Sequence, residues 1–308
     1  MNRNVEWNGV YPAVLTMFHE NGDIDFDMYL KNINAQVDAG VQGIIIGGSL
    51  GESSTITHQD RLDLLKATLD SVGDKVDVIL NIAEGSTRAA ISLAKAAEAN
   101  GADGLMLLPP MMYKPTDEEV VTFFKTVAAE TSLPIILYNN PVDYKIEITM
   151  DMFEQLQDVP NIKASKESTR DISNVSRMKS RFGDRFKILC GVDTLALEEL
   201  LMGADGWVAG LVDAFPEETV AIYRLAKVGR VAEAIDIYRW FLPILELDIN
   251  PQLVQNIKLA AVHTGIGSEH VRRPRKPLIG AERERVLKVI KDGLDTRPQL
   301  PEYKSIEV

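Results

Sequence analysis

Short, fully apolar stretches alternate along this chain with longer segments in which apolar residues recur at helical spacing. Three times a helical pattern stops at a glycine and an apolar strand follows soon after, at Gly40, Gly101 and Gly203. Glycine just past a helix end is the usual C-terminal signal. A strand that is apolar at every position is buried on both faces, which is typical of a parallel sheet.

The alternation continues over most of the chain and predicts an α/β fold, a (β/α)8 TIM barrel with a C-terminal helical appendage. A doubly wound sheet is the alternative, but it would usually carry a phosphate-binding glycine fingerprint after its first strand, and residues 10–20 have none. The predicted strands are residues 9–17, 44–46, 76–81, 105–108, 133–138, 162–166, 186–190 and 207–209. The predicted helices are residues 26–40, 58–72, 86–100, 116–130, 149–157, 170–182, 194–203 and 215–228.

Beyond the eighth unit no strand pattern remains. Residues 231–247, 251–262 and 282–294 are predicted to be helices. We therefore expect a catalytic barrel domain at residues 1–229 and a C-terminal helical extension at residues 230–308, packed on the barrel.

Composition narrows the function. The 308 residues are 45% hydrophobic and 25% charged, with a net charge of −12, which argues against nucleic acid or an anionic membrane as a partner. The single cysteine, Cys190, cannot form an intrachain disulfide, and no Cys/His cluster has zinc-ligand spacing. Residues 1–7 show no apolar signal segment and no run approaches a membrane span, so we expect a cytoplasmic protein without a metal.

Polar residues at the carboxyl ends of the predicted strands are the candidates for chemistry, because barrels of this type build their active sites there. Lys166 ends the sixth predicted strand. Burial there would lower its pKa and supply a free amine to attack a ketone, whereas the alternative is a solvated loop lysine. Tyr138 ends the fifth strand and is suited to proton transfer; the alternative is a buried phenol bonded to a backbone carbonyl.

Three motifs occur in order at strand ends: Gly48-Ser49-Leu50-Gly51-Glu52, Tyr138-Asn139-Asn140-Pro141 and Lys166-Glu167. Together they resemble the motifs of the class I lysine Schiff-base lyases typified by dihydrodipicolinate synthase and N-acetylneuraminate lyase.

The resemblance implies that Lys166 forms the Schiff base and Tyr138 moves the proton. It implies no cofactor, because the lysine supplies the electron sink, and a homo-oligomer, commonly a dimer of dimers. Glu52 is expected to cap the following helix or to structure the loop. Ser49 would cradle the substrate carboxylate, and Gly191 and Asp193 would contact its distal part, with a surface turn as their alternative. The expected substrate-binding residues are Gly48, Ser49, Leu50, Gly191, Asp193 and Val208.

The chain departs from dihydrodipicolinate synthase at three positions. Met112 stands where that enzyme has a tyrosine donated across a dimer interface, with Tyr113 adjacent as a substitute. Asp143 stands where the synthase has the arginine that binds its aldehyde substrate, and Leu50 replaces a threonine.

These departures leave the Schiff base intact and favour a lyase acting on a single small 2-oxo or 2-imino acid. The preferred reaction is the dehydration and deamination of 1-pyrroline-4-hydroxy-2-carboxylate. The alternatives are 4-hydroxy-tetrahydrodipicolinate synthase, an aldolase for 2-keto-3-deoxy sugar acids or N-acetylneuraminate, and a non-catalytic barrel that binds a keto acid.

Overall fold

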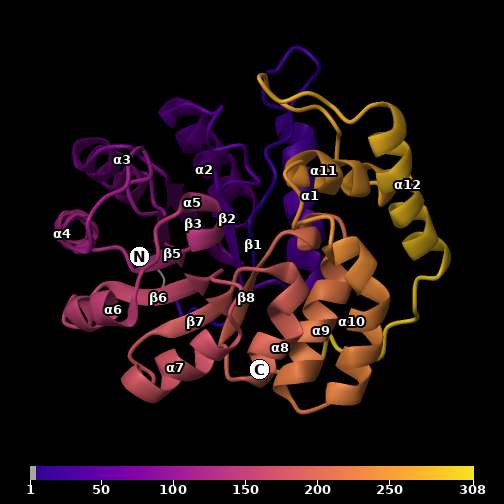
Figure 1. Cartoon of the computed structure of the whole chain (residues 1–308). Coiled ribbons are helices and arrows are strands. Elements are labelled where there is room, and N and C mark those ends of the chain that lie inside the picture. Colours follow the sequence, from indigo (N-terminus) through magenta and orange to yellow (C-terminus); the bar gives the residue numbers. More distant parts are fainter. Residues whose placement is uncertain (1–4) are drawn as a thin grey trace.

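The computed structural model describes residues 5–308, so the first four residues of the predicted catalytic domain lie outside the described part. Eight parallel strands occupy the centre, and most of the helices surround them (Figure 1). The strands are hydrogen-bonded in the order β1-β8-β7-β6-β5-β4-β3-β2. Between β1 and β2 the Val14 amide donates to the Ile45 carbonyl at 3.1 Å, which brings the two edges of the sheet together. The predicted (β/α)8 barrel is confirmed.

The strands are apolar because both of their faces are covered. Ile44, Ile45 and Ile46 are fully buried, as expected for a parallel sheet with side chains filling its interior and helices covering its outside. Residues 13–17, predicted as the end of the first strand, are buried but lie beyond it. The strands are β1 Gly9–Pro12, β2 Gly43–Ile46, β3 Asp77–Ile82, β4 Gly104–Leu107, β5 Ile135–Asn139, β6 Ile162–Glu167, β7 Lys187–Cys190 and β8 Gly206–Ala209.

Local sequence signals explain where several helices begin. Thr57 and Asp60 form a reciprocal capping box at the start of α2, and Thr116 and Glu119 form another at α4. The helices of the barrel are α1 Phe26–Ala39, α2 His58–Val72, α3 Thr87–Ala99, α4 Asp117–Ala128, α6 Met150–Leu156, α7 Ser173–Phe182, α8 Ala196–Leu201 and α9 Pro216–Lys227.

Short helical turns at the carboxyl ends of three strands were not predicted as separate elements. A one-turn helix, α5 (Pro141–Tyr144), follows β5 directly, with Asn140 as its cap and Pro141 at its first position. The predicted helix at residues 194–203 is a 3-10 turn, η1 (Asp193–Leu195), followed by α8. A further 3-10 turn, η2 (Leu211–Asp213), follows β8. These turns fix residues at the rim of the barrel.

The C-terminal residues form three longer helices, α10 (Val231–Leu245), α11 (Leu253–His263) and α12 (Gly280–Asp295), which lie together on one side of the barrel (Figure 1). Phe241 of α10 packs edge-on against Phe215, at the start of α9, with ring centroids 5.3 Å apart. An Arg297 guanidinium nitrogen donates to a carboxylate oxygen of Glu218 in α9 at 3.0 Å. These contacts join the helices to the barrel, while the division into two domains at residue 229 stays a prediction.

Candidate active site

Lys166 lies on β6, in register with Tyr138 on the neighbouring strand β5. Its side chain is only 6% exposed, and its ammonium nitrogen lies 4.1 Å from the centre of the Tyr138 ring. Burial lowers the pKa of Lys166 below its usual value, which increases the fraction of neutral amine. The structure thus places a buried lysine, not a solvated loop lysine, at the carboxyl end of the barrel, where it can act as a nucleophile.

Tyr138 is also buried, and its hydroxyl oxygen accepts a hydrogen bond from the Asn140 side-chain amide at 3.1 Å. The oxygen is the acceptor in this bond, so the phenol keeps its own proton to donate. Burial raises the pKa of Tyr138 to about 12, which keeps the phenol protonated near neutral pH. The hydrogen-bond partner of the Tyr138 hydroxyl is thus a side-chain amide. The alternative prediction for Tyr138, a buried phenol bonded to a backbone carbonyl, differs from this arrangement.

A cavity of about 420 Å³ opens above the two residues. Its walls come from the carboxyl ends of several strands, from the turns after them and from the connection between α10 and α11. Among the residues predicted from the sequence, those that line the cavity are Gly48, Ser49, Leu50, Tyr138, Lys166, Gly191 and Val208. Their roles toward a substrate stay predictions.

Ser49 lies in the loop after β2, and glycines allow this loop to turn sharply. Gly47 has a φ of +70°, and a Cβ on Gly51 would lie 2.9 Å from the Val14 carbonyl oxygen. The Asn81 side chain donates to the Gly47 carbonyl at 2.9 Å and fixes the loop from β3. The Ser49 hydroxyl forms a hydrogen bond with the hydroxyl of Tyr144, a residue that the sequence analysis did not select.

Gly191 leaves room for the nucleophile. A Cβ at this position would lie 2.7 Å from Cε of Lys166 and 2.1 Å from the Ser168 hydroxyl oxygen. Both distances are far below van der Waals contact, so no other residue fits beside Lys166 without displacing it.

Asp193 lies behind the cavity wall. Its side chain is 1% exposed, which excludes the surface turn, and it does not line the cavity; its predicted contact with a substrate stays a prediction. Its carboxylate accepts hydrogen bonds from the Trp207 indole at 2.9 Å and from the amides of Gly210 and Leu211 at 3.1 and 2.7 Å. The physical reason is that the turn after β8 needs an acceptor for its buried amides. Asp193 therefore fixes the floor beneath the cavity.

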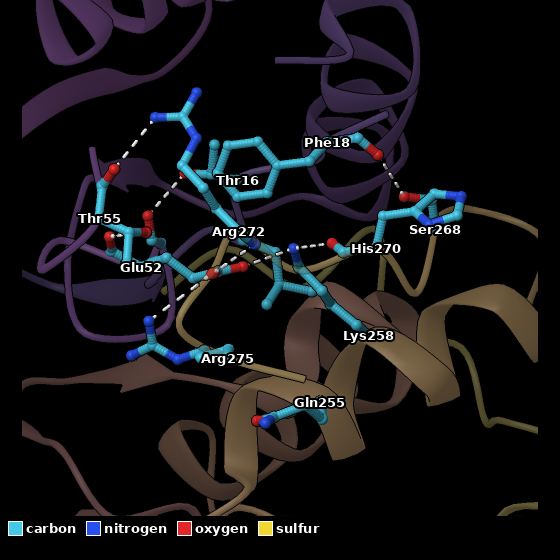
Figure 2. Close-up of polar contacts among 12 residues, drawn as sticks. Thr16, Phe18, Glu52, Thr55, Gln255, Lys258, Ser268, His270, Arg272 and Arg275 are labelled. Atoms are coloured by element: carbon cyan, nitrogen blue, oxygen red, sulfur yellow. Dashed lines mark hydrogen bonds and ion pairs between the residues drawn. The ribbon is translucent and has the colours of Figure 1, made fainter. Parts of the chain in front are cut away.

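Glu52 also has a role different from helix capping, since Thr57 caps α2. Figure 2 shows the Glu52 carboxylate between the ammonium of Lys258 and the guanidinium of Arg275. The Lys258 nitrogen lies 2.7 Å from one carboxylate oxygen, and both side chains are fully buried. The other oxygen accepts from the Arg272 amide at 3.1 Å. The loop that carries Ser49 is thereby held to α11 and to the segment after it.

The outer wall of the cavity carries charged and polar residues that the sequence analysis did not assign to the site. Arg170, with a φ of +64°, follows β6, and Asp248 and Asn250 come from the connection between α10 and α11. Burial, and next to it the Asp193 carboxylate, raise the pKa of Asp248 well above its usual value. Asp143, known from the sequence only as a departure from the synthase, lines the same wall. Residues of irregular connections carry no periodic signal, so only the folded chain reveals them.

Met112 and Tyr113 are 81% and 53% exposed and do not line the cavity. Within the chain described, neither side chain reaches Lys166. Residues 5–308 contain no group of three or more His, Cys, Asp or Glu side chains placed to hold a metal ion. In the same part of the chain, no helix is long and apolar enough to cross a membrane.

A (β/α)8 barrel with a buried lysine and a buried tyrosine at its carboxyl end defines the class of protein, and comparison with known proteins defines the family. The sequence model of the Dihydrodipicolinate synthetase family matches residues 6–293. The chain belongs to this family, whose members are class I Schiff-base lyases, and it is a lyase of this family.

Among its relatives is the 4-hydroxy-tetrahydrodipicolinate synthase of Moorella thermoacetica, 31% identical over 92% of this chain and 97% of the relative. The synthase of Persephonella marina is 33% identical over 93% and 98% of the two chains. The solved structure of dihydrodipicolinate synthase from Aquifex aeolicus is similar with a TM-score of 0.88 and 29% identity, covering 92% of this chain and 97% of that one. A prophage protein of the family from E. coli K12, solved in complex with pyruvate, has a TM-score of 0.88 and 26% identity over 94% and 99%.

Proposed function

We propose that the chain is a lyase that forms a Schiff base between Lys166 and a small 2-oxo or 2-imino acid, and that it dehydrates and deaminates 1-pyrroline-4-hydroxy-2-carboxylate. The observation that carries the Schiff base is the buried Lys166 amine, 4.1 Å from the Tyr138 ring centre, at the base of a cavity of about 420 Å³. A cavity of this size accommodates a small acid.

In this reaction Lys166 attacks C2 of the cyclic imine, and the ring C2–N bond breaks as the lysine iminium forms. The iminium withdraws electrons, so a proton leaves C3 and the C4 hydroxyl departs as water. A proton then leaves C5 and another adds at C3, so that the double bond moves; a proton passes from the nitrogen to C4, and C5 becomes an imine. One further water hydrolyses this imine to ammonia and the aldehyde, and another releases the product from Lys166. The balance is one substrate and one net water to ammonia and the 2-oxo acid semialdehyde.

Departure of the C4 hydroxyl requires a proton donor away from the lysine. Asp248 lines the cavity, and its raised pKa favours the protonated carboxyl, which can donate. Asp143 is a second carboxyl on that wall. Two carboxyl groups at this place favour a substrate with a hydroxyl at its far end.

A purified-protein screen tests this proposal. We expect ammonia release from 1-pyrroline-4-hydroxy-2-carboxylate, measured by a coupled glutamate dehydrogenase assay, and none from the variant Lys166→Ala. Ammonia release that persists unchanged in Lys166→Ala would exclude Lys166 as the nucleophile. Pyruvate release from a 2-keto-3-deoxy sugar acid, without ammonia from the pyrroline, would replace the reaction with an aldol cleavage.

A second candidate is 4-hydroxy-tetrahydrodipicolinate synthase, the name borne by the relatives described above. The structural observation in its favour is Arg170, a cation on the cavity wall that could bind a second carboxylate. Condensation of pyruvate with aspartate semialdehyde would identify this activity. Arg170→Met should then raise KM for the semialdehyde about tenfold or more and leave KM for pyruvate unchanged.

We infer that the protein is a cytoplasmic homo-oligomer, a dimer of dimers. We also infer that its partner is a small acid substrate and that it binds neither nucleic acid nor a membrane. The exposed Met112 and Tyr113 side chains, on the rim after β4, support a second copy as the partner that covers them. Sedimentation velocity at micromolar concentration should give four chains per particle. A Met112→Glu variant should shift the particles to smaller species.

A further inference from the structure

Tyr144 supplies a second phenol to the cavity. It ends the one-turn helix α5, which begins two residues after Asn139, the last residue of β5. Its hydroxyl forms the hydrogen bond with Ser49, which lies in the loop after β2 and also lines the cavity. Its ring meets the Tyr138 ring edge to face, with centroids 5.5 Å apart and planes at 86°. Tyr144 thus connects the Ser49 loop to Tyr138, which lies against Lys166.

The position of this phenol is fixed from both sides. Pro141 starts α5 and Asn140 caps it, its side chain accepting from the Asp143 amide at 3.1 Å. The same Asn140 side chain donates to the Tyr138 hydroxyl. One asparagine therefore orients both tyrosines. Burial raises the pKa of Tyr144, so its hydroxyl stays protonated and can donate or accept with Ser49.

The Schiff base needs such a relay. When the Lys166 nitrogen attacks a ketone, a C–N bond forms, and the oxygen must gain two protons before the C–O bond breaks and water leaves. The neutral amine gives up one proton as it becomes the iminium, and the other is the proton that the Lys166 ammonium lost before the attack. Either hydroxyl of the Ser49–Tyr144 pair can be the donor, so a proton can be passed along the pair and restored afterwards, with no net change in the protein.

We propose that Tyr144 is a catalytic residue of this site and, with Ser49, forms a proton relay contained within one subunit. This inference rests on the proposed Schiff base at Lys166, and it does not depend on which 2-oxo or 2-imino acid is the true substrate. It also assigns a function to α5, the turn that has no counterpart among the predicted elements.

Exchange of the methyl protons of pyruvate in D2O, followed by NMR, tests the relay without knowledge of the substrate. Tyr144→Phe keeps the ring that packs on Tyr138 and removes only the hydroxyl. We expect it to slow exchange about 10² to 10⁴-fold. Ser49→Ala should slow exchange similarly, and the double variant should be no slower than the slower single variant, because both residues belong to one pathway. Tyr29→Phe is the matched control and should exchange at the normal rate, because this buried tyrosine of α1 bonds the Thr68 hydroxyl and lies outside the cavity.

Borohydride trapping at long incubation separates this inference from the proposed function. We expect Tyr144→Phe still to yield the pyruvate adduct on Lys166, only more slowly. A Tyr144→Phe variant that exchanges protons at the normal rate would overturn the relay and leave the Schiff base intact. Failure of the unaltered protein to form any adduct on Lys166 would instead overturn the proposed function, and the relay with it.

Discussion

The properties of Lys166 depend on its immediate surroundings and not on its own chemistry alone. The chain has a second lysine on the same strand, Lys163, which is exposed and does not line the cavity. Three residues further along β6, burial lowers the pKa of Lys166 and the Tyr138 ring lies beside its nitrogen. The two lysines therefore form a natural matched pair for testing the nucleophile.

We predict that Lys166→Ala lowers turnover by at least about 10⁴-fold, because covalent catalysis loses its nucleophile. Mass spectrometry after treatment with pyruvate and borohydride should show no adduct. Lys163→Ala should keep both activity and adduct. If Lys163→Ala lost the adduct and Lys166→Ala kept it, the nucleophile would be Lys163 and our assignment would be wrong.

The rate of adduct formation should also depend on pH. Only the neutral amine attacks a ketone, and the lowered pKa of Lys166 moves its titration below the ordinary lysine value of 10.5. We predict that the trapping rate with pyruvate rises with pH and levels off below 10.5. A rate still rising at that pH would show that the lysine is not desolvated.

Replacement of Gly191 tests whether the Lys166 side chain needs the free space beside it. Gly191→Ala places a methyl group 2.7 Å from Cε of Lys166 and must displace that side chain. We predict a loss of about 10²-fold in kcat, since a misplacement of about 1 Å has that effect on a reacting group. Circular dichroism should show the fold retained, and equal kcat values would mean that the lysine moves without consequence.

At the scale of elements, the buried pair of Glu52 and Lys258 joins the loop after β2 to α11. Both side chains are inaccessible to solvent. Removal of Lys258 leaves the buried Glu52 carboxylate with only the more distant Arg275 guanidinium, 3.6 Å away, as its counter-charge. Burial lowers the pKa of Lys258 to about 8, even beside the carboxylate of Glu52, which reflects the cost of placing a cation there. The pair therefore determines where the two elements meet more than it adds to stability.

We predict that Lys258→Met lowers the free energy of unfolding by about 3–5 kcal/mol in urea titrations. The double variant Glu52→Gln with Lys258→Met should recover part of that loss, because no carboxylate then remains buried without its nearest counter-charge. The exposed pair of Lys66 and Asp70 is the control, and Lys66→Met should change stability by no more than about 0.5 kcal/mol. A small effect in Lys258→Met would mean that water reaches Glu52.

At the scale of the whole molecule, the barrel and the C-terminal helices share one cavity and one buried ion pair. We predict that they unfold together in a single transition. Two variants test this, one keeping only Trp207 in β8 and the other only Trp240 in α10, each followed by fluorescence in urea. Coincident midpoints are expected, whereas separate midpoints would define two independent domains.

The sequence predicted the barrel well because strand burial leaves a repeated signal. Each apolar run is short, fully buried and followed by an amphipathic helix, so the eight units are visible without the structure. Lys166 and Tyr138 could be selected as candidates for the same reason, since strand ends are where a barrel places its chemistry, and both line the cavity.

The remainder of the site depends on contacts between distant residues. Asp248 and Asn250 lie in a connection without periodicity, and nothing local shows that it lines the cavity. Tyr144 follows a recognisable motif, but only the fold shows its hydroxyl against Ser49, 95 positions earlier. The hydrogen bonds of Asp193 could not be predicted because two of its partners are backbone amides, which a sequence does not display.

The ion pair between Glu52 and Lys258 spans 206 positions of the sequence. During synthesis, the loop that carries Ser49 is therefore made long before Lys258, which anchors it. Asp248 is also made late. A growing chain can contain Lys166 and Tyr138 while the outer wall of its cavity is still missing. We therefore expect the complete cavity to form only near the end of synthesis, after α11 has been made.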